Sequence, residues 1–356
     1  MTEHAFPRTA GRALAALAAL ALAACADEPL ATHATAAPAA PRLWTFAGAT
    51  ETAVAATPAT ETHPGISGTR VVYTANHDIF VRDLAAGTGG GTLVVGTPAL
   101  QGRPAISGDY VVYEDNGTGA ARVRAHDLRD GTDFQLGAPG AAEFDPAVSG
   151  ARAVYTSIPG DGRGSIYLYD LATRTEHPIR VLPANVTPKP GAAEPDIGGD
   201  LVVWREQWGS PAVMTIMLHD LRTGVTREIA RSTAGSATLR APATDGRRVV
   251  YEELRGGSFD VYLYDPATDS TRRITSAPDH QVNARIDGDL IVWEDYRLGM
   301  GYADIYAHDL ATGTEHRVTS AWGNQTMPAI HGNRIVWHDG RKMADADIYM
   351  LTLSGP

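Results

Sequence analysis

The sequence predicts an all-β fold built from seven similar units, on the strength of three observations. A pattern with a period of about forty residues runs through the chain: a glycine, with a large aromatic residue five positions after it in every copy. Glycine (37) and proline (22) are plentiful, which favours many turns over long helices. Residues 49–68, near the start, resemble residues 313–332, near the end. Such a repeat is typical of a β-propeller, here with seven blades; six blades is the alternative if one weak copy forms no blade.

Seven copies of the repeat are defined by these anchor positions. The glycines are Gly68, Gly108, Gly150, Gly199, Gly246, Gly288 and Gly332. The aromatic residues are Tyr73, Tyr113, Tyr155, Trp204, Tyr251, Trp293 and Trp337. In six of the seven copies a proline stands four residues before the glycine, which adds a third fixed position to the pattern.

Each copy is expected to form four short strands. In PAISGDYVVYED (104–115) the first strand ends at a tight turn around the glycine, and the apolar run before the aromatic residue reads as a strand covered on both faces. A variable loop leads to a third strand, as at 166–171, 261–266 and 305–310. A hairpin turn then leads to a fourth strand, as at 315–320. Four antiparallel strands make one propeller blade.

The resemblance between the two ends of the repeat region predicts how the ring closes. The seventh copy has three expected strands and then reaches Pro356 without a fourth. The stretch ETAVAAT (51–57) matches the fourth-strand position that leads into the next copy elsewhere. We therefore expect residues 51–57 to complete the last blade, which would hide sheet edges that an open array exposes.

The first residues read as an export signal. Arg8 and Arg12 precede twelve apolar residues, 13–24, a run too short to span a bilayer and suited to a signal-peptide core. The run ends in Leu-Ala-Ala-Cys at Cys25, the only cysteine, and this sequence resembles a bacterial lipobox. The resemblance implies that Cys25 is lipid-modified and that the protein is anchored, by preference, to the outer membrane, facing the periplasm or the cell surface. An ordinary Ala-x-Ala cleavage that leaves a free thiol is the alternative.

This gives three expected segments: residues 1–25 as the signal peptide, 26–42 as an Ala/Pro/Thr-rich tether, and 43–356 as the propeller. The net charge of −11 argues against nucleic acid as a partner, because a duplex repels an acidic chain. We expect a monomer that meets the membrane through its lipid anchor only.

The repeat resembles two groups of propeller repeats, the TolB-type repeats and the propeller repeats of surface proteins. Trp293-Glu294-Asp295 with Asp304-Ile305-Tyr306, and the matching residues of the last copy (337–339 and 347–349), carry the second likeness. It covers residues 49–356 and implies the propeller fold. The TolB-type Ser-Pro-Asp-Gly is replaced here by Ser-Gly-Asp or Asp-Gly-Asp, and only the tether precedes the propeller. TolB's role in the cell envelope therefore does not carry over by default.

Motifs for catalysis are missing from the sequence. It contains no Gly-x-Ser-x-Gly, no His-Glu-x-x-His, and no glycine-rich loop followed by Lys-Ser/Thr. We expect no catalytic residue, no metal, no cofactor and no enzyme activity. The alternative is a carbohydrate-active lyase or hydrolase. A related propeller fold serves pectin-fragment lyases with a histidine-held metal, and His280 beside Gln281 is the only hint of one.

Two sets of repeated polar residues are interpreted as structural. Aspartates that end or open the third strand are expected to bond their own turn backbone. Five residues seven positions before an anchor glycine are expected to satisfy loop backbone between blades, with a ring of ligands as the alternative. These five are Glu61, Gln101, Glu143, Gln281 and Gln325.

Arginines and aromatic residues gather in the expected loops of copies four to seven, on one face of the ring. Such residues make binding hot spots, and the face is expected to bind an envelope protein or a polysaccharide. A rim of solvated loops, with Trp208 or Trp322 folded back over blade edges, is the alternative. The predicted function is a non-catalytic envelope scaffold. The candidate residues are Arg205, Gln207, Trp208, Arg255, Tyr296, Arg297, Trp322 and Arg341.

Overall fold

A computed structural model describes residues 44–355 except 88, 89, 118, 138, 139, 184, 235–237, 343 and 344. Every described residue belongs to one compact unit, Pro41–Pro356. The expected signal peptide, Cys25 and tether therefore lie outside the described residues. No helix within the described part has the length and apolarity needed to cross a membrane.

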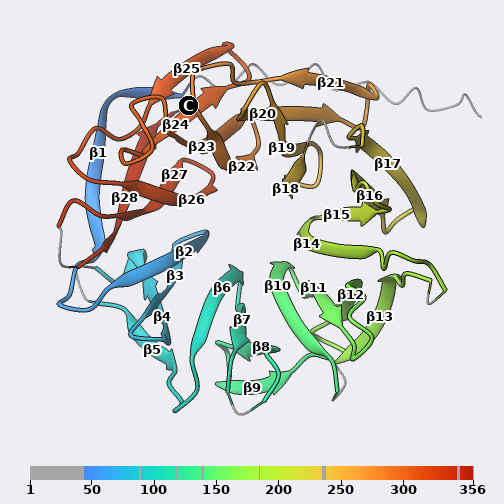
Figure 1. Ribbon diagram of the computed structural model, residues 1–356. Coiled ribbons are helices and arrows are strands. Elements are labelled where there is room, and N and C mark those ends of the chain that lie inside the picture. The colour runs from blue at the N-terminus through green and yellow to red at the C-terminus, as the bar shows by residue number, and fades with distance from the viewer. Residues whose placement is uncertain are drawn as a thin grey trace, which may run out of the picture. The chain divides into compact units, whose positions relative to one another are not determined.

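Seven four-stranded antiparallel sheets surround a central axis, as predicted (Figure 1). Blades one to three are β2 (Glu61–Ser67), β3 (Arg70–Ala75), β4 (Asp78–Asp83) and β5 (Thr92–Val95); β6 (Gln101–Ser107), β7 (Tyr110–Asp115), β8 (Arg122–Asp127) and β9 (Thr132–Gln135); and β10 (Ala142–Ser149), β11 (Arg152–Ile158), β12 (Ser165–Asp170) and β13 (Thr175–Arg180). A 3-10 helix, η1 (Leu84–Ala86), follows β4.

Blades four to six are β14 (Gly191–Gly198), β15 (Leu201–Trp208), β16 (Val213–Asp220) and β17 (Val225–Arg231); β18 (Leu239–Thr244), β19 (Val249–Arg255), β20 (Ser258–Asp265) and β21 (Ser270–Arg273); and β22 (Gln281–Asp287), β23 (Leu290–Asp295), β24 (Asp304–Asp309) and β25 (Thr314–Arg317). Blade seven is β26 (Gln325–His331), β27 (Arg334–Asp339), β28 (Asp347–Ser354) and β1 (Thr45–Ala55).

The ring closes through β1, as the matched ends predict. β1 runs antiparallel to β28, with Glu51 opposite Leu351 and Thr52 opposite Met350. The strand starts at Thr45, six residues before the predicted start at residue 51, and ends at Ala55. Two residues of β1 lie in a core cluster shared by blades seven and one, so the closing strand also carries buried apolar contacts.

The hydrophobic core lies between neighbouring blades. The second-strand runs are buried throughout, because each second strand is covered by a blade on either side. In blade four, Val203 and Ile216 pack in one cluster with Val249 and Tyr251 of blade five. In five blades the anchor aromatic residue stacks on a third-strand ring, as Trp293 does on Tyr306 with ring centroids 6.2 Å apart. Each blade therefore needs its neighbours to bury its apolar faces.

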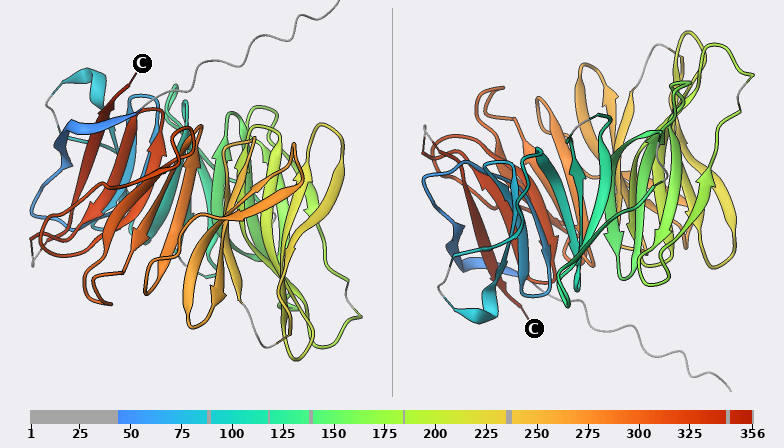
Figure 2. Two further views of the ribbon diagram at one scale, coloured as in Figure 1. Left: turned by 90° about the horizontal axis from the view of Figure 1, so that it is seen from above. Right: turned by 90° about the horizontal axis from the view of Figure 1, so that it is seen from below.

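The loops that join the strands gather at two opposite ends of the sheets (Figure 2). We define the top face as the end with the loops from second to third strands and the loops from each blade to the next. The Gly turns and the turns from third to fourth strands lie on the bottom face. β1 begins at the bottom end, since Thr45 pairs with Ser354 at the end of β28.

The repeated polar residues mostly do what the sequence predicts. Asp170 accepts bonds from the N–H groups of Ala172 and Thr173 in its own turn, at 3.0 and 2.8 Å. Gln281 donates from Nε2 to the carbonyls of Pro278 and Asp279, so it satisfies loop backbone as expected. Two of the four aspartates that open the third strand differ, because they pair with arginines of the fourth strand, whereas Asp347 pairs with Lys342 of the preceding loop. Asp260 bonds Arg273 and Asp304 bonds Arg317, both at 2.7 Å.

The first, innermost strand of every blade carries a β-bulge that was not predicted from the sequence. The register shifts once in each pair of first and second strands. At the bulge one non-glycine residue has a positive φ, between 47° and 57°. These residues are His63, Arg103, Asp145, Glu194, Ala241, Asn283 and Met327.

Candidate functional site

The eight predicted binding residues lie in blades four to seven, where the top-face ends of second strands and the loops beyond them are found. Three belong to the end of β15, one ends β19, and the other four lie in loops next to β23, β26 and β27. The structure divides them by environment. Three arginines and one tryptophan pair with carboxylates of their own blades, Arg205 and Tyr296 turn toward the inner strands, and Gln207 and Trp322 are exposed.

Arg297 and Arg341 are structural parts of their blades. Arg297 donates from Nε to Asp295, at 2.8 Å, and its guanidinium lies 4.1 Å from the centroid of the Tyr306 ring. Asp295 also accepts a bond from the indole N–H of Trp293, at 2.9 Å. Arg341 repeats this arrangement on Asp339 and Tyr349 in blade seven, and Arg255 pairs with Glu253 in blade five. The carboxylates compensate these charges, so the arginines form no uncompensated basic patch.

Blade four uses a variant of the same arrangement. The indole N–H groups of Trp204 and Trp208 both donate to Glu206, at 2.9 and 2.8 Å, and Arg180 forms an ion pair with the same carboxylate at 2.7 Å. Trp208 is half-buried and packs against the core cluster of its blade. Trp208 is therefore folded back over its blade edge, as the alternative interpretation holds. Gln207 is exposed.

Arg205 and Tyr296 point away from the loops. Arg205 pairs with Glu194 of the inner strand, at 2.9 Å. The Tyr296 hydroxyl donates to Glu294 at 3.1 Å, and burial raises the pKa of Tyr296. Both residues therefore belong to a network around the central axis rather than to an outward-facing surface.

That network is a set of carboxylates which we call the carboxylate belt: Glu114, Glu194, Glu252 and Glu294. Each accepts a bond from the backbone N–H of the bulged residue in the next blade. The donors, in the same order, are Asp145, Ala241, Asn283 and Met327. The belt therefore joins neighbouring blades. Three of its members directly follow the anchor aromatic residue, a regularity of the repeat that identifies these positions in the sequence.

Glu252 is the belt member with the strongest perturbation. Its side chain is fully buried, and burial raises its pKa from 4.5 to about 7, although Arg240 opposes the shift. Arg240 donates from Nε to Glu252 at 2.7 Å. Asn283 links Glu252 to Glu294, since its N–H donates to the first and its Nδ2 to the second. The arrangement satisfies buried backbone donors, which is a structural task.

Trp322 is the one large apolar side chain among the eight candidates that stays clearly exposed, and further exposed apolar side chains of blade six lie on the adjacent loop. Trp322 is 60% exposed, and Leu298, Met300 and Tyr302 of the adjacent loop are 56%, 69% and 56% exposed. The loops are joined because the N–H of residue 303 donates to Asn324 Oδ1 at 3.0 Å and the N–H of residue 325 donates to the carbonyl of residue 303. We call these four apolar side chains the blade-six patch.

Metal-binding chemistry has little support among the described residues. No group of three or more His, Cys, Asp or Glu side chains within that part of the chain could hold a metal ion. The ring of His280 accepts a bond from the N–H of Phe259 at 3.1 Å and lies 5.7 Å from the Phe259 ring. The single histidine hint is thus engaged in a contact within blade five.

Comparison with protein-family models gives no match, and no curated protein matches the sequence. Among solved structures, an oligogalacturonate lyase in complex with manganese has a TM-score of 0.63 at 15% identity, over 88% of this chain and 97% of that one. The β-propeller domain of the Trilobed protease from Pyrococcus furiosus has a TM-score of 0.62 at 11% identity, over 84% and 94%. A puromycin-hydrolysing peptidase of Mycobacterium tuberculosis has 0.58 at 13%, over 81% of this chain and 53% of that one.

TolB from Acinetobacter baumannii is also among the matches, at 18% identity and a TM-score of 0.47. The lyase, protease-domain and peptidase likenesses, each with a TM-score above 0.5, show the β-propeller fold. At such low identity a fold does not carry an activity or a partner with it.

The matches nevertheless correct one prediction. The chain was expected not to be an enzyme, but the structures with the higher TM-scores are a lyase, a protease domain and a peptidase. The expectation rested on missing sequence motifs, and motifs of that kind do not transfer between families. The missing motifs therefore do not exclude an enzyme, and the prediction of no enzyme activity is withdrawn; the likenesses themselves assign no reaction to this chain.

Proposed function

We propose that this protein is an exported cell-envelope propeller, anchored through Cys25, that docks a protein partner on the blade-six patch. The observation that supports it is the concentration of exposed apolar side chains on two adjacent top-face loops. Four of the eight large hydrophobic side chains that are exposed in the described part of the chain belong to this patch. Contiguous exposed apolar patches mark interaction sites, whereas single exposed hydrophobic residues need no explanation.

The composition of the patch favours a protein partner over a polysaccharide. Tyr, Trp and Met are enriched at the centres of protein interfaces. Leu298 and Met300 stand beside the two aromatic residues, and the nearby Arg297 is already paired with Asp295 and Glu315. An acidic polysaccharide would need free cationic groups here, and a protein with an apolar surface would not.

Rigidity of the loops supports the same proposal. Two turns fix the first loop, since the N–H of Gly299 donates to the carbonyl of Tyr296 and the N–H of Tyr302 to that of Gly299. The second loop is tied on both sides, because Asn324 also accepts a bond from Gly340 of blade seven. Side chains on pre-organised loops lose little conformational entropy on binding, so they can contribute more to affinity.

The proposal is tested by crosslinking in the cell envelope of the source organism. A photoreactive phenylalanine analogue replaces Met300, and the same analogue at Val225, which is 55% exposed on blade four, serves as the control. We expect a discrete adduct with one partner at residue 300 and none at residue 225. Leu298→Asp with Trp322→Ser should abolish the adduct and leave the melting temperature unchanged. Adducts that are equal at both positions, or that survive the double substitution, would contradict the proposal.

A further inference from the structure

Blade two departs from the repeat at a position that holds a large apolar residue in the other blades. The residue opposite the anchor aromatic on the third strand is an arginine, Arg124, which pairs with Tyr113. The corresponding residues elsewhere are Phe80, Tyr167, Met217, Tyr262, Tyr306 and Tyr349. A charged and partly exposed group thus stands at a position where the other blades have a large apolar side chain.

A second departure leaves the same region uncovered. In blades five to seven an arginine nine positions after the anchor glycine lies over the third-strand ring. Blade two has Gly117 at that position, so it lacks the arginine that covers the third-strand ring in those blades. A cleft of about 1070 Å³ results, between β8 and β9 of blade two and the end of β5 with its following loop in blade one.

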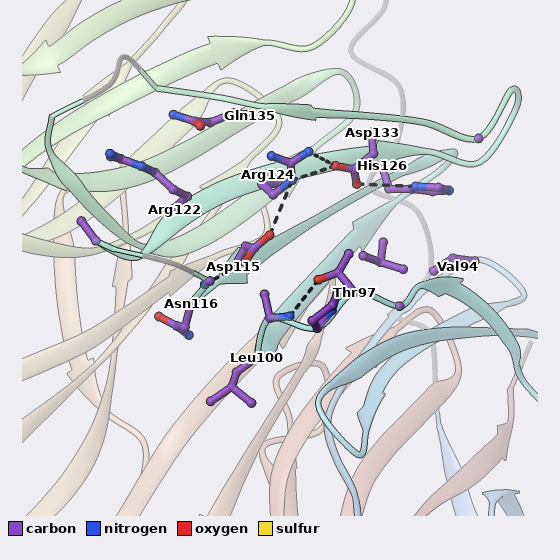
Figure 3. A pocket seen from close by; sticks show the side chains of 17 residues that line it. Val94, Thr97, Leu100, Asp115, Asn116, Arg122, Arg124, His126, Asp133 and Gln135 are labelled. Carbon is purple, nitrogen blue, oxygen red and sulfur yellow. Dashed lines mark hydrogen bonds and ion pairs between the residues drawn. The ribbon is translucent and has the colours of Figure 1, made fainter.

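The two walls of the cleft differ in chemistry (Figure 3). Blade one contributes small and apolar residues, among them Val94, Pro98 and Leu100. The blade-two wall is polar, because side chains alternate along strands and so bring residues 122, 124 and 126 of β8 to one face. Its polar side chains are Asp115, Asn116, Arg122, Arg124, His126, Asp133 and Gln135.

These polar side chains are held in place by hydrogen bonds and ion pairs. Asp133 accepts bonds from Arg124 Nε at 2.7 Å and from the Tyr113 hydroxyl at 2.6 Å. Arg124 also lies 3.8 Å from Asp115. Arg122 donates to the carbonyl of Ala141. Two arginines and two aspartates line the cleft, so their charges balance.

One buried group in the cleft lacks a hydrogen-bond partner. His126 is 8% exposed, and its Nδ1 makes no hydrogen bond within the described part of the chain; it lies 3.7 Å from Asp133 Oδ2, an ion-pair distance when the histidine is protonated (Figure 3). A buried polar atom without a hydrogen-bond partner is costly, and the carboxylate of Asp133, 3.7 Å away, offsets part of that cost. His126 also lines the cleft, so its ring, though not the buried Nδ1, is within reach of a ligand there.

We propose that this cleft binds a neutral oligosaccharide of about two or three sugar units, a size that its volume accommodates. Sugar rings present hydroxyl groups at their edges and C–H groups on their faces. The hydroxyl groups would exchange bonds with Asp133, His126 and Arg124, which offer acceptors and donors. The C–H face would pack on Pro98 and Leu100 across the cleft. Because the charges balance, a sugar acid gains no net attraction.

The inference is tested with defined trisaccharides on the full propeller. Cellotriose, maltotriose, chitotriose and trigalacturonate are offered to the protein, and binding is measured by saturation-transfer NMR and calorimetry. We expect at least one of the neutral trisaccharides to bind, and trigalacturonate to bind no more tightly. His126→Ala should weaken binding about tenfold or more, which corresponds to the loss of a bonded partner. Arg222→Ala, on the distant blade four, is the matched control and should change nothing.

A second variant keeps the test independent of folding. Arg124→Tyr with Asp133→Thr gives blade two the residues that blade five has at these positions, Tyr262 and Thr271, so the blade is expected to remain folded while the cleft fills. Binding should be lost in this variant. Binding that survives it, binding by trigalacturonate alone, or no binding by any of the four sugars at 10 mM (roughly the weakest affinity a small built site should show) would overturn the inference. Substitutions in the blade-six patch should leave sugar binding unchanged, so this test is separate from that of the proposed function.

Discussion

At the scale of the residue, the carboxyl group of Glu252 shows how packing between two blades changes the pKa of a side chain. It is fully buried between Arg240 and the backbone of the next blade, and burial raises its pKa from 4.5 to about 7. Since the native pKa lies above the unfolded one, the native state holds the proton more tightly. The stability that this provides is complete below about pH 4.5 and is lost as the pH rises through about 7. Between these values, unfolding should become easier with rising pH.

Glu252→Gln should therefore flatten this pH dependence, because the amide resembles the protonated acid in shape and carries no charge. Between pH 5 and pH 8 the free energy of unfolding should fall further in the unsubstituted protein than in the variant. The difference should approach about 3 kcal/mol, the equivalent of the shift in pKa. Urea denaturation at the two pH values measures it. Glu228→Gln, at the partly exposed pair with Arg231, controls for the amide itself. An unchanged slope in the Glu252 variant would show that this carboxyl does not govern the dependence.

At the scale of the element, the Gly turns of neighbouring blades contact each other. Ser67, Ser107 and Ser149, each just before an anchor glycine, accept a bond from the anchor N–H of the next blade. Blade four has Gly198 at this position. A Cβ there would lie 2.4 Å from the backbone nitrogen of Gly246 and 2.6 Å from the Thr244 carbonyl oxygen. The backbone of blade five therefore lies too close to residue 198 for any side chain at that position.

Gly198→Ser, which copies the other blades, should consequently destabilise the protein. Backbone atoms must move to admit the Cβ, and overpacking of this kind costs about 1–3 kcal/mol. Thermal denaturation measures the loss. Gly191→Ser in the same strand is the control, because a Cβ at residue 191 meets nothing within 4 Å. Equal melting temperatures for the two variants would refute the close contact of blades four and five.

At the scale of the whole molecule, β1 joins the ends of the chain. Val54 and Ala55 are 1% and 5% exposed, in the cluster that blade seven shares with blade one. Deleting residues 43–57 removes these contacts and bares the edge of β28. Each lost ladder bond costs about 0.5–1.5 kcal/mol, so several together cost several kcal/mol, and a bare edge invites association. We expect a lower melting temperature and oligomers in gel filtration, which a variant lacking residues 26–40 should not show.

The anchor is the second prediction at this scale. The Leu-Ala-Ala-Cys sequence that ends at Cys25 predicts that Cys25→Ser prevents lipid modification. Acyl chains contribute about 0.8 kcal/mol per buried methylene, so the loss should release the protein from membranes. Fractionation after a salt wash, together with gel mobility, measures this. Retention on the membrane with unchanged mobility would show that another feature anchors the chain.

The sequence by itself determined the seven blades, their strand order and the closing strand, because each depends on local patterns: the Gly turn, the apolar second strand and the aromatic residue five positions after the glycine. Tertiary structure alone decided which loop residues are available for binding. In the sequence, Arg297 and Trp322 both look like exposed loop residues. In the structure Arg297 contacts Asp295 and Tyr306, whereas Trp322 stays exposed. The cleft likewise depends on residues from two different blades: Arg124 of blade two and the small residues of blade one that face it. A repeat pattern records what the blades share, whereas a site arises where neighbouring blades depart from it together, and that depends on contacts across the ring.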